Sequence, residues 1–146
     1  MEGESLRAYA RAYLYEAGWN PEDVKRKVAG PPGGRVVQTA AEGAATNEFF
    51  VEMLAAQTLH AEASGSLLAR SPEMDLLLRL AGTTQISKAI REKGSSAGKP
   101  FLLVVAGRKR PAGIRGMSGQ ELPRRELSKN ELRRVEKAAL LSAQKG

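Results

Sequence analysis

Short apolar runs separated by polar and glycine-rich segments predict the strands of this chain. Residues 101–106, FLLVVA, form a continuous apolar run between Pro100 and Gly107. Such a run is typical of a strand that is buried on both faces of its sheet. Residues 11–19 and 35–40 are rich in aromatic, aliphatic and β-branched side chains and predict two more strands.

Capping residues followed by apolar residues at helical spacing predict the helices. We expect helix starts at Asn20 with Pro21 next, at Thr46 or Asn47, at Ser71, and at a capping box over residues 128–131. The first helix is expected to end at Gly30, before a turn over residues 31–34. The helix after residue 47 is expected to bury four side chains: Phe50, Met53, Leu54 and Leu59.

The element order is therefore strand, helix, strand, two helices, strand and helix. This order predicts an α/β fold (α+β-like), a small mixed sheet of three to four strands covered by helices. The 146 residues are expected to form a single domain, 1–146. Residues 107–127 are rich in glycine and arginine and are expected to be an irregular basic loop.

Residues 71–94 contain a helical pattern that is interrupted in its middle. An apolar run at 74–80 is followed by Ala-Gly-Thr-Thr at 81–84, and the helical spacing resumes over 85–94. Glycine inside a helix costs about 1 kcal/mol relative to alanine. The interruption therefore needs a structural or functional reason.

The order of residues in this region resembles that of a known family. The matching positions are Ser71, Met74, Asp75, Leu76, Leu77, Ala81, Gly82, Gln85, Ile86, Ala89 and Gly94. They resemble the signature of the small kinase-binding subunit of the KEOPS complex (TPRKB-type family), and the order of elements is similar over about residues 11–142. The sequence departs from the family at Thr84, where arginine is typical, so an ionic contact there does not transfer.

The resemblance implies a non-catalytic accessory subunit that binds the KEOPS kinase and the CCA acceptor end of tRNA. Other subunits would make the modification, threonylcarbamoyladenosine. If a helix restarts after Gly82, freed amides and two threonine hydroxyls would form an anion-binding pocket suited to single-stranded RNA. The expected tRNA-binding residues are Arg79, Gly82, Thr83, Thr84, Gln85 and Lys88. The alternative is a helix kink in which Gly82 only permits close packing.

The net charge of +7 is placed unevenly along the chain. Residues 1–100 carry 12 basic and 12 acidic side chains, whereas residues 101–146 carry 11 basic and four acidic ones. An excess confined to the last third indicates contact with a polyanion. A highly charged surface of the kind found in thermophilic proteins is the other interpretation.

Residues 108–125 of the basic loop carry six cations and a single glutamate, Glu121. The cations are Arg108, Lys109, Arg110, Arg115, Arg124 and Arg125. Arg108, Lys109 and Arg110 are assigned to tRNA binding through phosphates, without base stacking because the loop has no aromatic residue. The alternative is a charged loop that has no partner.

The final helix has apolar residues on more than one side. Leu132, Val135 and Ala139 are expected to dock it on the sheet, and four residues are assigned to kinase binding: Val135, Ala138, Leu140 and Leu141. Burial of all these residues within the chain is the alternative, and a homodimer that buries the second face is a third possibility.

Composition argues against several other classes of protein. The chain has no cysteine and one histidine, His60, so no disulfide, metal site or cofactor is expected. No nucleophile–base constellation can be assembled, so we expect no enzyme activity and no small-molecule substrate. The polar N-terminus and the absence of a long apolar run predict a cytoplasmic protein without membrane contact. The competing function is a free-standing basic RNA-binding protein of ribosome or RNP type.

Overall fold

The sheet and the helices form a layered α/β domain in the computed structural model. The structure describes residues 8–29, 35–109 and 119–145, so the predicted turn at 31–34 and the site residue Arg110 lie outside the described residues. The strands are β1 (Tyr9–Tyr15), β2 (Val36–Ala41), β3 (Phe101–Gly107) and β4 (Gln120–Glu121). The helices are α2 (Pro21–Ala29), η1 (Glu42–Ala44), α3 (Glu48–Ala63), α4 (Pro72–Ala81), α5 (Ile86–Lys93), α6 (Lys129–Ala139) and α7 (Leu141–Lys145).

The strand order is β2-β3-β1-β4, so the most apolar strand lies inside the sheet. β3 pairs with β1 on one side and with β2 on the other, and all seven of its residues are buried. The predicted α/β class and the double burial of this strand are therefore confirmed. The prediction of a mixed sheet was wrong, because β3 runs opposite to both neighbours and every described pairing is antiparallel.

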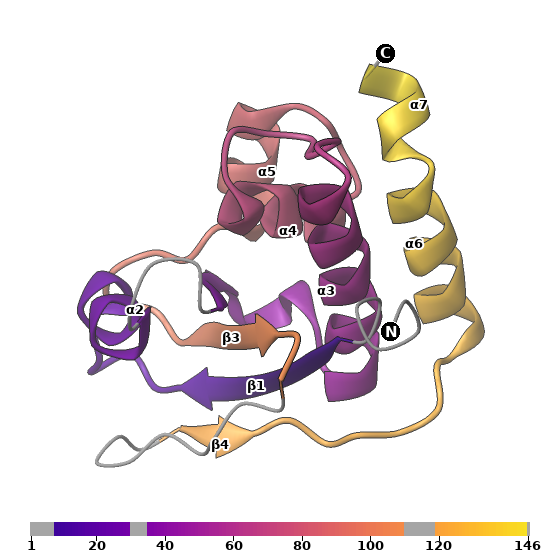
Figure 1. Ribbon diagram of the computed structural model, residues 1–146. Helices are drawn as coiled ribbons and strands as arrows, with labels where there is room; N and C mark the ends of the chain where they lie inside the picture. The colour runs from indigo at the N-terminus through magenta and orange to yellow at the C-terminus, as the bar shows by residue number, and fades with distance from the viewer. Residues whose placement is uncertain (1–7, 30–34, 110–118, 146) are drawn as a thin grey trace.

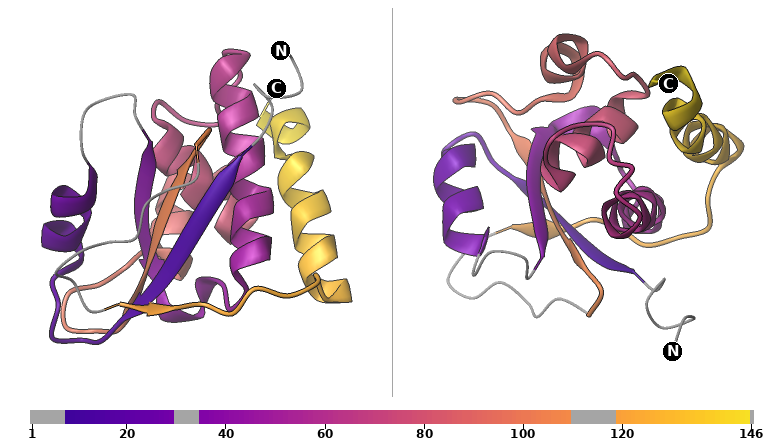
Figure 2. Two further views of the ribbon diagram at one scale, coloured as in Figure 1. Left: turned by 60° about the horizontal axis from the view of Figure 1, so that its bottom comes forward. Right: turned by 45° about the horizontal axis from the view of Figure 1, so that its top comes forward.

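Helices cover both faces of the sheet, as the predicted burial of β3 requires. α3 and α6 lie on one side of the strands and α2 lies on the other (Figure 1, and Figure 2, left). Leu102, Val104 and Ala106 belong to the core cluster beneath α3 and α4, whereas Leu103 and Val105 pack with α2. This alternation is the two-residue period of a strand.

The first strand ends earlier than its composition suggests. Residues 11–19 were predicted, but β1 spans Tyr9–Tyr15 because a turn follows, in which the Trp19 amide donates to the Glu16 carbonyl over 3.2 Å. Trp19 packs edge-on against Tyr15, with ring centroids 5.6 Å apart. Trp19 is therefore a packing residue beyond the strand.

The predicted N-caps account for the helix starts. The side chains of Asn20, Asn47, Ser71 and Ser128 each accept a backbone amide of the first turn. Thr46, the alternative to Asn47, does not cap α3. The capping box of α6 is complete, because the Glu131 carboxylate accepts a hydrogen bond from the Ser128 amide over 2.9 Å. Polar side chains thus satisfy amides that the first turn of a helix leaves unpaired.

We expect replacement of Glu131 by glutamine to remove part of the stability at neutral pH. Burial raises the pKa of the Glu131 carboxyl, but bonds from Ser128 and Asn47 and the charge of Arg125 outweigh burial, so the net pKa is lowered. A lowered folded-state pKa stabilises above the unfolded value, about 4.3, and this contribution is lost as the pH falls below it. Glu131→Gln should reduce the free energy of unfolding by about 1 kcal/mol at pH 7.

Denaturant titrations from pH 7 to pH 3 measure this difference between the wild type and the variant. The difference should shrink as the pH falls below about 4.3. A difference that stays constant across the range would exclude the charge of Glu131 as its source.

Candidate functional site

The interrupted helix at residues 71–94 is two helices joined at Gly82. Gly82 adopts the left-handed conformation, with φ of 71°, and ends α4. The amides of Gly82 and Thr83 both donate to the Leu78 carbonyl, and the amide of Gln85 donates to the Thr83 hydroxyl over 3.1 Å. The amides of Gly82, Thr83 and Gln85 are therefore occupied. The expected restart of the helix is confirmed by α5, whose first residues have no side-chain cap among the described residues.

The side chains around this junction remain accessible. Thr83 and Thr84 are partly exposed, and Gln85 and Lys88 are exposed. Among the described residues, Lys88 is in no ion pair. The junction thus offers hydroxyls, an amide side chain and a cation on its surface, and no described side chain caps the first amides of α5.

Arg79, which we expected beside the junction as an RNA contact, lies inside the protein. It is 5% exposed, and its Nε donates to Asp75 Oδ1 over 2.6 Å. Its remaining bonds go to Asp75 Oδ2, to Gln57 Oε1 and to the Ala138 carbonyl. The assignment of Arg79 to tRNA is therefore corrected: its guanidinium joins α3, α4 and α6 and does not reach solvent.

Lys137 of α6, and not Arg79, places a positive charge beside the junction. A Cβ added to Gly82 would lie 3.5 Å from Lys137 Cε and 3.6 Å from Lys137 Nζ, so the Lys137 side chain lies directly over the glycine. Lys137 is exposed and in no ion pair within the described part of the chain. The sequence offered no signal for this contact, because 55 positions separate the two residues and only the packing of α6 against α4 brings them together.

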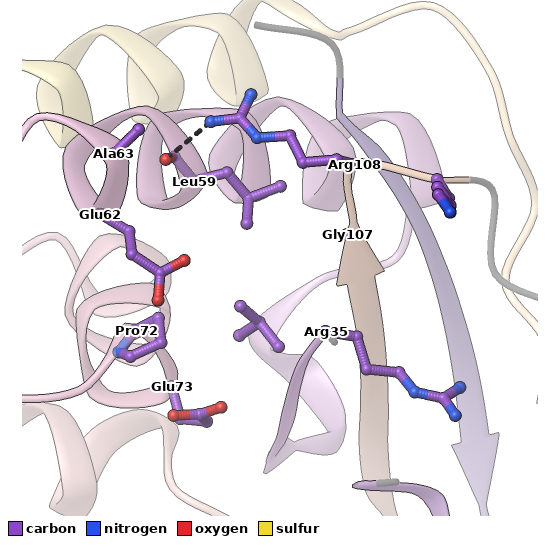
Figure 3. Close-up of a pocket in the computed structure, with 10 residues that line it drawn as sticks. Arg35, Leu59, Glu62, Ala63, Pro72, Glu73, Gly107 and Arg108 are labelled. Atoms are coloured by element: carbon purple, nitrogen blue, oxygen red, sulfur yellow. Dashed lines mark hydrogen bonds between the residues drawn. The ribbon is translucent and has the colours of Figure 1, made fainter. Parts of the chain in front are cut away.

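The described start of the basic loop lines a hollow of about 640 Å³ at the other end of α4. Figure 3 shows Glu62 and Glu73 on its helical side, while Arg35 extends away from them. Arg108 Nη2 donates to the Leu59 carbonyl over 2.9 Å, and Lys109 is exposed. The hollow therefore carries charges of both signs, which does not resemble the purely basic phosphate-binding surface that we expected.

Other arginines of the basic segment hold the fold together. Arg124 pairs with Glu48 and Glu52, whose carboxylates also accept the backbone amides of Ala12 and Ala10 in β1. Arg125 donates to the Thr46 carbonyl and hydroxyl. Part of the basic excess is thus used within the chain, which the count of charges could not reveal. The segment is also not wholly irregular, because β4 pairs with β1.

The final helix docks with a different face from the one predicted. Glu131, Val135 and Ala138 are the buried residues of α6, and Leu141 of α7 is fully buried. Leu132 is 50% exposed and Ala139 is exposed, so the stripe through them does not dock the helix. The helix packs on α3 and α4, and the expectation that it docks on the sheet was wrong.

Three of the four residues assigned to kinase binding are therefore in the core. Val135 is 8% exposed, and Ala138 and Leu141 are 0% exposed. These three are corrected to internal packing residues, as the alternative interpretation held. Leu140, at 64% exposed, is the one residue of the four that faces solvent.

The described residues contain no cluster of three or more His, Cys, Asp or Glu that could hold a metal ion. His60 lies on the exposed surface of α3, as expected for a helix-surface residue. No described helix has the length and apolar character needed to cross a bilayer. In comparisons with known proteins, the sequence matches no family model and no curated protein.

Proposed function

We propose that this protein is a non-catalytic accessory subunit of a KEOPS-type complex. It binds the CCA end of tRNA at the junction between α4 and α5, and it binds the kinase through the outer face of α6. In this proposal other subunits carry out the tRNA threonylcarbamoyladenosine modification. The observation that carries the proposal is the position of Lys137 over Gly82, which the partly exposed Thr83 and Thr84 follow in sequence.

The chemistry of the junction suits the end of a single strand of RNA. Lys137 and Lys88 are cations for phosphates, and the hydroxyls of Thr83 and Thr84 are hydrogen-bonding groups for ribose or phosphate. Ile86, 47% exposed, offers an apolar surface to an unstacked base. Arg79 has no part in this site because it is buried.

The exposed apolar residues of α6 support the proposed kinase contact. Leu132 and Leu140 are 50% and 64% exposed, although a helix docked by one stripe gains nothing from leucines on its outer side. A free-standing RNA-binding protein has no need of them. This favours the accessory subunit over the competing function.

We expect removal of the terminal CCA to weaken tRNA binding at least tenfold in the wild type, since the proposed site holds the end of the strand. Lys137→Ala should weaken binding of intact tRNA and lower the salt slope by about 0.7, the value for one single-strand phosphate contact. It should have little effect on tRNA that already lacks CCA. Filter binding of both tRNAs across a salt series measures these effects.

Two matched variants remove the same charge elsewhere. Lys27→Ala removes an exposed lysine from α2, on the opposite face of the sheet, and should leave affinity unchanged. Lys109→Ala tests the basic loop. Equal affinity of the wild type for the two tRNAs, with a loss in Lys109→Ala, would refute the proposed site and favour the free-standing RNA-binding protein.

A further inference from the structure

The sheet topology brings two glutamates to the same end of the sheet. Tyr15 at the end of β1 and Ala41 at the end of β2 both lie opposite Phe101, the first residue of β3. The residues that follow these strands, Glu16 and Glu42, therefore leave the sheet on either side of the start of β3.

A hollow of about 370 Å³ lies at this end of the sheet, where β1 and β2 end and β3 begins. Its walls include both glutamates, Tyr15, Trp19 and Gln120 at the start of β4. This volume lies within the range of small-ligand sites, about 300–1,000 Å³. The hollow is at the opposite end of β3 from the hollow beside Arg108, which follows that strand.

Two aromatic rings form a corner of this hollow. Trp19 is partly exposed and meets Tyr15 at an interplanar angle of 78°, and Tyr15 is stacked on Phe101 with centroids 5.2 Å apart. The stacked pair is buried and fixes the position of the Trp19 ring. The faces of such rings attract cations, and tryptophan does so most strongly.

The described charged side chains that line this hollow are all negative, whereas the protein as a whole has a positive net charge. Glu16 and Glu42 are exposed, and neither is in an ion pair within the described ranges. No lysine or arginine is among the described residues that line it, although the chain carries a net charge of +7. Tyr15 is 1% exposed, and its buried hydroxyl has no hydrogen-bond partner among the described residues.

We propose that this hollow binds an organic ammonium group, with Trp19 against the cation and the carboxylates of Glu16 and Glu42 as its counter-ions. Carboxylates and an aromatic face are the two kinds of group that recognise ammonium ions. A free polyamine and the lysine side chain of a partner protein carry the same group. This site does not depend on the proposed RNA and kinase contacts.

Trp19 is the one tryptophan of the chain, so its fluorescence reports directly on the hollow. Titration with spermidine, or with Nα-acetyl-lysine methylamide, should give a saturable change in emission. Butane-1,4-diol, and sodium chloride at matched ionic strength, should give no saturable change in emission. Saturation by spermidine alone assigns the site to a free polyamine, and saturation by the lysine derivative assigns it to a side chain.

Matched variants test the residues. Glu16→Gln/Glu42→Gln should weaken binding about five- to tenfold, as expected for two partly exposed ion pairs. Glu92→Gln/Glu136→Gln removes two exposed carboxylates from α5 and α6 and should leave the binding affinity unchanged. Trp19→Leu, followed by calorimetry, should weaken binding about fivefold. The proposal is overturned if no titration saturates, if the diol acts like the amines, or if the first double variant binds as the wild type does.

Discussion

Replacing Asp75 with alanine should destabilise the protein by about 3–5 kcal/mol, because the change leaves a buried guanidinium without its counter-ion. Asp75 is 0% exposed and accepts bonds from Arg79, from the Thr58 hydroxyl over 2.6 Å and from the Leu68 amide over 2.9 Å. Alanine would leave all of these donors without an acceptor inside the core. Denaturant unfolding followed by Trp19 fluorescence measures the loss.

A double-mutant cycle separates the ion pair from the rest of the network. Arg79→Met alone should be about as harmful as Asp75→Ala, because it leaves Asp75 as an uncompensated buried charge. The double variant should lose much less than the sum of the two. Additive losses would show that the pair is not the source of the effect. Arg79→Met, where it remains folded, should also bind tRNA with an unchanged salt slope, since Arg79 is buried.

Leu141→Glu should destabilise the protein by more than about 3 kcal/mol, whereas Leu140→Glu should change its stability by less than about 0.5 kcal/mol. Leu141 is fully buried in the core cluster that includes Val135 and Ala138, so glutamate there would bury a charge. Leu140 is 64% exposed, so its replacement removes few internal contacts. Circular dichroism and denaturant unfolding measure both effects.

The same pair of variants tests the proposed kinase surface. Leu140→Glu, which we expect to remain folded, should weaken binding to the kinase about tenfold or more, because it places a charge in an apolar contact. Unchanged affinity would exclude Leu140 from that contact. A shift from dimer to monomer in Leu140→Glu would instead favour the homodimer.

Local signals in the sequence predicted the local structure well. Asn47, Ser71 and Ser128 cap their helices because a short polar side chain next to an apolar run satisfies the first amides in any context. The run at 101–106 is apolar at every position, which favours burial on both faces, and all of its residues are buried. The order of the strands could not be predicted, because β3 enters between β1 and β2 from a distant part of the chain.

The site was harder to predict, because burial and tertiary contacts decide what a charged residue does. Asp75 and Arg79 are four positions apart, a spacing that could have indicated an ion pair on one helix face. The sequence could not indicate that this face is buried against α3 and α6. Helical spacing also permitted either of two stripes of the final helix to dock, and α3 and α4 select the stripe of Val135 and Ala138.

The position of β3 has a consequence for how the chain is made. β1 and β2 do not pair with each other, and each needs the strand that begins at Phe101. During synthesis, all the residues between Tyr15 and Phe101 must therefore leave the ribosome before β1 can pair with β3. Such distant pairing slows folding and leaves strand edges exposed to aggregation in the meantime. A nascent chain halted before Phe101 should thus be sensitive to protease and bind chaperones, and extension past Gly107 should begin to protect it.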